Sequence, residues 1–293
     1  MQPEPTVVPD DHIDRWKVAV SQIRTSAVLL SRMIDPRPGS GLAVADSLYP
    51  SEKASAWARS YLDAGCEHLN LWADLVAPAE FDANTVNNVA YRPYLLLARA
   101  GLESVAHGLW LLDVEDSAEC VGRHVRMMHR DIGYFIKARR AGQLSVSKIE
   151  DQQKTLVDRA SEALPTVTTT DKPPGYENIV RYAATAQEQD PDRWAYLWNL
   201  ASGAGHGQNW FSLEGYLLAV GDEYEPGYYR VARRPDVELL TETVEAGAAT
   251  LRYATLLWAG RAGYPYREMY VQAMCEVIDR MPTITGQPRS AET

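Results

Sequence analysis

Three polar side chains follow one line along the most apolar stretch of the sequence, residues 91–113. Arg99, Glu103 and His107 recur every fourth residue, so on a helix they lie within about 80° of arc. The other positions are mostly Leu, Val, Ala and Trp, which predicts a helix buried on nearly every side at the centre of a bundle. Because a buried charge is tolerated only when it is paired, we expect an ion pair between Arg99 and Glu103 and a partner for His107 across the core.

A glycine-rich segment, residues 199–210, is the candidate for that partner. Glycines at this density let two helix backbones approach closely, so that His206 could reach the core. The Gly-x-Gly-x-Gly spacing also resembles a phosphate-binding loop, but no predicted strand precedes it and no Lys-Ser/Thr follows it. The sequence therefore predicts a buried polar network, or ligand site, that comprises Arg99, Glu103, His107, Ser202 and His206.

A second pair of residues could act on RNA without a metal. In such a ribonuclease an arginine holds the scissile phosphate and a histidine transfers protons, and Arg123 and His129 have a compatible spacing. On an uninterrupted helix, however, these two side chains diverge by about 120°, so a joint site requires a helix that starts at Arg123 or a second subunit. The alternative is a solvated basic face that Glu119 partly neutralises.

Basic residues concentrate on the predicted helix of residues 117–140. Its apolar side carries Val121, Val125 and Met128, and a stripe of cations lies about 140° round the helix from it. We call this set the basic stripe and expect it to form a contact surface; it comprises Arg123, Arg126, Arg130 and Lys137.

Other chemistry finds little support in the sequence. Cys66 and His68 face different sides of a helix and lack a second pair of zinc ligands, so we expect no metal site and no cofactor. No His-Glu-x-x-His, Glu-x-x-His or Gly-x-Ser-x-Gly motif is present. The three cysteines are widely spaced within predicted helices, which indicates buried, reduced thiols.

The overall charge limits the range of partners. The chain of 293 residues has a net charge of −10, which disfavours broad binding to nucleic acid or anionic membranes. The first residues show neither a basic segment nor an apolar leader, and no uncharged apolar run reaches the length of a membrane span. We therefore expect a cytoplasmic protein that does not associate with membranes.

Helical periodicity extends over most of the chain and predicts an all-α bundle of about nine or ten helices. The main predicted helices cover residues 11–34, 51–77, 91–113, 117–140, 145–164, 176–188, 190 onward, 235–261 and 266–281. The helical pattern is expected to continue through residues 210–220 and to break after them, where residues 228–232 could form half of a small β-hairpin. Residues 10–282 are expected to form one domain with a possible subdomain boundary at 165–175, after a disordered segment 1–9 and before a flexible tail 283–293.

Two segments together resemble a known group of proteins. Residues 98–113, followed by the arginine-bearing helix, and residues 196–210 resemble uncharacterised, mainly actinobacterial all-helical proteins that are distantly similar to HEPN domains. The group's marks fall on Arg99, Glu103, Ser202, His206 and Gly207. The HEPN nuclease pattern, an arginine and a histidine separated by four to six residues, is absent before His206 and fits only Arg123 and His129.

This resemblance implies a HEPN-like helical protein that acts through RNA or a protein partner. Its role would be in defence or that of a toxin. If the protein is an enzyme, the resemblance implies a metal-independent ribonuclease. The alternative is a small-molecule-binding or purely structural bundle whose site is the polar network. The many aromatic residues also favour a homodimer, although the sequence does not place its interface.

Overall fold

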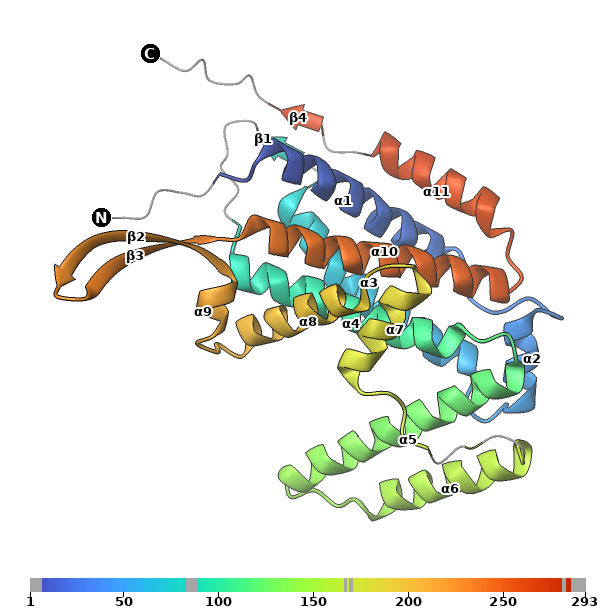
Figure 1. Ribbon diagram of the computed structural model, residues 1–293. Coiled ribbons are helices and arrows are strands. Elements are labelled where there is room, and N and C mark those ends of the chain that lie inside the picture. Colours follow the sequence, from blue (N-terminus) through green and yellow to red (C-terminus); the bar gives the residue numbers. More distant parts are fainter. Residues whose placement is uncertain are drawn as a thin grey trace.

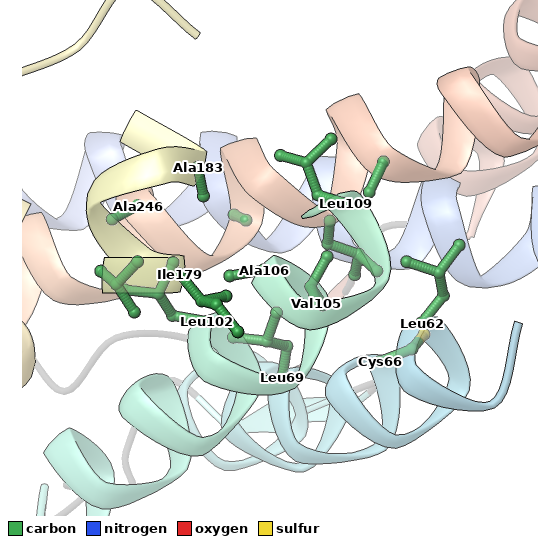
Figure 2. Close-up of a cluster of buried hydrophobic side chains, with 14 of the residues drawn as sticks. Leu62, Cys66, Leu69, Leu102, Val105, Ala106, Leu109, Ile179, Ala183 and Ala246 are labelled. Atoms are coloured by element: carbon green, nitrogen blue, oxygen red, sulfur yellow. The ribbon is translucent and has the colours of Figure 1, made fainter. Parts of the chain in front are cut away.

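Helix α4 (Tyr91–Leu112) lies at the centre of the computed structural model, which describes residues 7–78, 80–82, 89–165, 168, 171–280 and 283–285. It packs against α3 (Ala54–Val76), α7 (Tyr176–Ala186), α8 (Pro191–Gly205) and α10 (Val237–Arg261). Figure 2 shows how Leu102, Val105 and Leu109 of α4 meet apolar side chains of α3, α7 and α10. The helix has the length and hydropathy of a membrane span, but 67% of that window is buried inside the protein, as in the core helix of a bundle.

Glycines allow α3 and α4 to approach closely. A Cβ atom added to Gly65 would lie 2.2 Å from Val105 Cγ2 and 2.9 Å from the carbonyl oxygen of Gly101. A Cβ atom on Gly101 would in turn lie 2.5 Å from Leu69 Cγ. Any side chain at these positions would push the helices apart, so their separation depends on these glycines.

Helix α1 (Asp10–Ser31) covers the outer side of α10, so that α10 lies between α1 and the central helix (Figure 1). Trp16 Nε1 donates a hydrogen bond of 2.8 Å to Thr241 Oγ1, and the Arg15 guanidinium binds the Glu245 carboxylate through two nitrogens at 2.8 and 2.6 Å. Helix α11 (Tyr266–Asp279) packs on α1 from the other side. Elements from the two ends of the described chain thus share one layer.

Two antiparallel helices, α5 (Ser117–Ala141) and α6 (Ser147–Ala163), extend from the lower side of the bundle in Figure 1. Helix α6 buries only Leu156 and Ala160, which agrees with its polar sequence and its outer position. The short helix α2 (Gly41–Leu48) packs against α5 and was not predicted, because eight residues are too few to establish a period. Ser40 caps it by accepting a hydrogen bond from the Ala43 amide.

The all-α prediction is confirmed, and the described residues contain eleven helices and a β-hairpin. The hairpin is longer than expected: β2 (Tyr216–Glu225) pairs antiparallel with β3 (Tyr228–Pro235). The expectation of helix through residues 210–220 was wrong, since the helical turn α9 (Phe211–Glu214) stops at Gly215 and the apolar run that follows enters β2. A short apolar run does not distinguish a helix from a strand by its period.

The predicted end segments fall largely on parts of the chain that are not described. Residues 1–6 and 286–293 lie outside the described residues, while residues 7–9 directly precede α1. Within the predicted tail, β4 (Thr283–Thr285) pairs in parallel with β1 (Glu80–Asp82). The possible subdomain boundary at residues 165–175 lies in the connection from α6 to α7, of which residues 166–167 and 169–170 are outside the described residues.

Candidate functional site

The predicted ion pair on α4 is present, and its partner across the core is a tryptophan. Arg99 Nη2 lies 2.9 Å from Glu103 Oε2. Trp198 of α8 donates a hydrogen bond of 2.8 Å from Nε1 to the same Glu103 oxygen, and the Arg99 guanidinium stands 4.9 Å from the centroid of the Trp198 ring. The pair is thus half-buried beneath α8, where hydrogen bonding and cation–π contact compensate the charges.

His107 lies one turn further along α4 and is buried with one ring nitrogen unpartnered. Its Nδ1 lies 2.7 Å from the carbonyl oxygen of Glu103, which can only accept, so Nδ1 carries the proton. Burial lowers the pKa of His107 to about 4, which leaves the ring neutral at pH 7. Its Nε2 is then a hydrogen-bond acceptor, and it has no partner among the described residues. Such a buried acceptor costs roughly 1–3 kcal/mol.

The glycine-rich segment does not complete the polar network. Ser202 Oγ donates to the carbonyl oxygen of Trp198 in its own helix, at 2.8 Å. The prediction for His206 was wrong: α8 ends at Gly205, and His206 lies exposed at its C-terminal cap. The close packing expected of the glycines is confirmed, because a Cβ atom on Gly205 would lie 2.1 Å from Leu96 Cδ1 of α4.

Arg123 and His129 do not form a joint site within the chain. Helix α5 begins at Ser117 and continues past both residues, so their side chains diverge as on any uninterrupted helix. The Arg123 guanidinium instead donates to the carbonyl oxygens of Trp110 and Asp113, at 2.6 and 3.1 Å, at the end of α4. It serves there as a C-terminal cap for α4.

The expectation that the basic stripe forms a contact surface was also wrong for its arginines. Arg126 pairs with Glu119 at 2.5 Å and donates to the carbonyl oxygen of Thr168 at 3.1 Å. Arg130 donates to the carbonyl oxygen of Pro174 at 2.9 Å. These two arginines hold the connection between α6 and α7 against α5, and only Lys137 of the stripe is exposed to solvent.

His107 borders a small cavity of about 120 Å³ between α3, α4, α5 and α7. The ring of Tyr61 stacks on His107 at 5.4 Å between centroids, and the Tyr176 ring meets His107 edge-on at 5.1 Å. We call this cavity the tyrosine pocket; it is lined by Tyr61, Glu103, Ser104, His107, Arg130, Asp131, Tyr134 and Tyr176.

Burial raises the pKa of two tyrosines of the tyrosine pocket. Burial, reinforced by the Asp131 carboxylate, raises the pKa of Tyr61 to about 12. Burial also raises the pKa of Tyr176, and the neighbouring Tyr134 adds to the effect. The hydroxyls of Tyr61 and Tyr176 therefore keep their protons near neutral pH. Arg130 stands 5.1 Å from the centroid of the Tyr176 ring.

Sequence reasoning missed the three tyrosines of the pocket. They come from three different helices, and no spacing within one segment relates Tyr61 to Tyr134 or Tyr176. Only the polar line on α4, through Glu103 and His107, pointed to this place in the fold.

A larger groove of about 650 Å³ lies between α10 and the turn from α7 to α8. Two of its arginines are already paired: Arg15 with Glu245, and Arg193 with Glu242. A third arginine, Arg252, is exposed to solvent, and no described residue of the groove has a buried side-chain N or O atom without a partner, whereas His107 of the tyrosine pocket has one.

The described residues contain no cluster of three His, Cys, Asp or Glu side chains that could hold a metal ion. Two of the cysteines are buried, and burial raises the pKa of Cys66 to about 12. The expectation of three buried thiols was wrong for Cys275, which is exposed on the outer helix α11. That helix packs on the bundle with one side only, so a helical position does not by itself imply burial.

No protein-family model matches the chain, and no curated protein or solved structure matches it either.

Proposed function

We propose that this protein binds a small amine in the tyrosine pocket. The observation that carries the proposal is the buried Nε2 of His107, a hydrogen-bond acceptor without a partner in a ring that borders a cavity. An N–H donor placed against this nitrogen would remove the cost of the unmet hydrogen bond.

The surroundings of His107 favour a donor that carries positive charge. The faces of tyrosine rings attract cations, and three tyrosines line the pocket. Asp131 contributes a carboxylate that has no ion-pair partner among the described residues, whereas Glu103 is neutralised by Arg99. The Arg130 guanidinium also lines the pocket and repels positive charge near His107, so binding of a cation depends on Asp131 and the tyrosine rings.

The volume restricts the ligand further. A water molecule occupies about 30 Å³ in the liquid, so a cavity of this size accommodates on the order of four waters or an organic molecule of a few non-hydrogen atoms. Typical pockets for larger cofactors have several times this volume. The proposed ligand class is therefore an amine of the size of ethanolamine.

The RNA hypothesis finds less support in this geometry. It depended on the basic stripe, whose three arginines donate to backbone carbonyls in the described part of the chain. Arg126 and Arg130 could turn to phosphates only by releasing the connection between α6 and α7, and Arg123 only by releasing the end of α4. We therefore favour the small-molecule alternative over a HEPN-like role.

Calorimetric titration and NMR with ethanolamine test the proposal, with ethylene glycol as the neutral analogue and glycolate as the anionic one. We expect ethanolamine to bind most tightly and to shift the ring resonances of His107. Asn at position 107 can keep a donor for the Glu103 carbonyl but lacks the Nε2 acceptor, so His107→Asn should abolish binding. Asp131→Asn, at an exposed position, should weaken it by about tenfold.

His124→Gln is the matched control. His124 is also a buried, neutral histidine that makes one hydrogen bond to a backbone carbonyl, that of Glu52, but it borders no part of the tyrosine pocket. This variant should bind ethanolamine like the wild type. An absence of binding to the wild type, or equal binding by wild type and His107→Asn, would refute the proposal.

A further inference from the structure

The hairpin of β2 and β3 projects from the bundle as an arm (Figure 1). Every residue from 217 to 234 is exposed, and the apolar side chains include Val220, which is 70% exposed, and Val231, which is 48% exposed. Only the base of the arm is anchored, where the Tyr216 ring packs edge-on against Tyr91 and Phe211. An isolated two-stranded hairpin is at best marginally stable in water, so packing against a partner would stabilise the arm.

The strand register defines what one face of the arm presents. Residues directly opposite each other in an antiparallel pair project on the same side, and the pairs alternate between the two sides. The pairs Leu218 with Arg233, Val220 with Val231 and Glu223 with Tyr229 therefore share one side, with the bulge between Val220 and Glu223 preserving this alignment. We call these six residues the arm face.

The arm face is complementary to a second copy of itself. Its inner end, near the bundle, is basic through Arg233, its middle is apolar, and its outer end is acidic through Glu223. Neither charge has an ion-pair partner among the described residues, although Glu223 Oε1 accepts a hydrogen bond of 2.7 Å from the Gly227 amide. When two arms lie antiparallel, each Arg233 meets the Glu223 of the other copy, and the valines meet at the two-fold axis.

We propose that two copies of this chain associate through their arm faces, with the arms antiparallel about a two-fold axis. This arrangement satisfies the requirement of a two-fold interface, in which the same surface must be complementary to itself. It also brings Arg233 close to the Tyr229 ring of the other copy, where a cation–π contact adds to the ion pair. The inference is independent of the ligand proposed for the tyrosine pocket.

The size of the surface predicts a reversible dimer. Six residues per copy bury less than the roughly 800 Å² per partner of a standard stable interface. We therefore expect a monomer–dimer equilibrium that depends on protein concentration, with a Kd on the order of 10 μM.

Sedimentation velocity over a range of concentrations, with charge-swap variants, tests the proposal. Arg233→Glu places two carboxylates opposite each other at both ends of the dimer, and Glu223→Arg places two cations there. Each variant alone should dimerise at least about tenfold more weakly than the wild type. An equimolar mixture of the two variants should regain dimer formation, because every contact in the mixed dimer then joins opposite charges.

Arg234→Glu is the matched control, since Arg234 pairs with Leu217 on the opposite side of the arm. The same charge change there should leave the Kd within about twofold of the wild-type value. Far-UV circular dichroism and thermal melts verify that each variant keeps the bundle, because the arm lies outside the core. A wild type that stays monomeric at all concentrations, a dimer unaffected by Arg233→Glu, or a mixture that remains monomeric would each overturn the proposal.

Discussion

The two buried histidines should make the stability of the protein fall steeply in mild acid. His107 and His124 are each held neutral by burial, which lowers the pKa of both to about 4 from the ordinary value of 6.5. Between these pH values the unfolded chain binds protons that the folded chain does not. The free energy of unfolding is therefore fully retained above pH 6.5 and is lost as the pH falls from 6.5 towards 4.

The magnitude follows from this difference in pKa. At pH 5 an unfolded histidine of pKa 6.5 is almost fully protonated, and a folded one of pKa 4 is almost fully neutral. The loss relative to pH 7.5 is then about 2 kcal/mol for each histidine and about 4 kcal/mol for both. This is a large part of the stability of an ordinary domain.

Urea unfolding at pH 7.5 and pH 5, followed by tryptophan fluorescence, measures the effect. His107→Asn and His124→Gln each remove one titrating group and leave an amide that can donate to the same backbone carbonyl. Each variant should lose about 2 kcal/mol less than the wild type between the two pH values, whatever its stability at pH 7.5. A variant whose pH-dependent loss equals that of the wild type would refute the assignment of a buried, neutral histidine at that position.

Two further predictions concern packing and thiol reactivity. Gly65→Ala should destabilise the protein by about 2 kcal/mol or more in urea unfolding, since its Cβ would lie 2.2 Å from Val105 Cγ2. Gly133→Ala, at a helical position with no atom closer than 3.8 Å to the new Cβ, should instead stabilise it by about 0.5–1 kcal/mol, and a loss at both sites would contradict the packing described. With a thiol reagent, the native protein should show one fast-reacting cysteine, which Cys275→Ser removes; rapid reaction of a second thiol would show that a buried cysteine is accessible.

Local spacing predicted the parts of the fold and site that depend on one helix. The apolar run of α4 and the interval between Arg99 and Glu103 both lie within a few turns, so their burial and pairing follow from helical geometry. The same reasoning failed for His206, because its position depends on where α8 ends. Helix α8 ends at Gly205, one residue before His206. The His206 side chain therefore does not project from the helix face that was expected to reach the core.

Tertiary contacts determine the features that spacing did not reveal. The cations of α5 form a regular stripe in sequence, but the connection between α6 and α7 folds over Arg126 and Arg130 and occupies them. The tyrosine pocket depends on four helices meeting at one point. Tyr176 lines it from the start of α7, 42 positions after Tyr134, and no local pattern specifies that the two meet at one place.

The contact between α1 and α10 has a consequence for how the protein is made. Trp16 of α1 binds Thr241 of α10, which follows it by 225 residues in the chain. At translation rates of 5–20 residues per second, the ribosome takes roughly 10–45 s to add that length. During this interval α1 can pack only against α3, for example through the edge-on contact of Trp16 with Trp72 at 5.5 Å. The side of α1 that meets α10 stays without its native partner, so the nascent chain is expected to depend on chaperones until α10 leaves the exit tunnel.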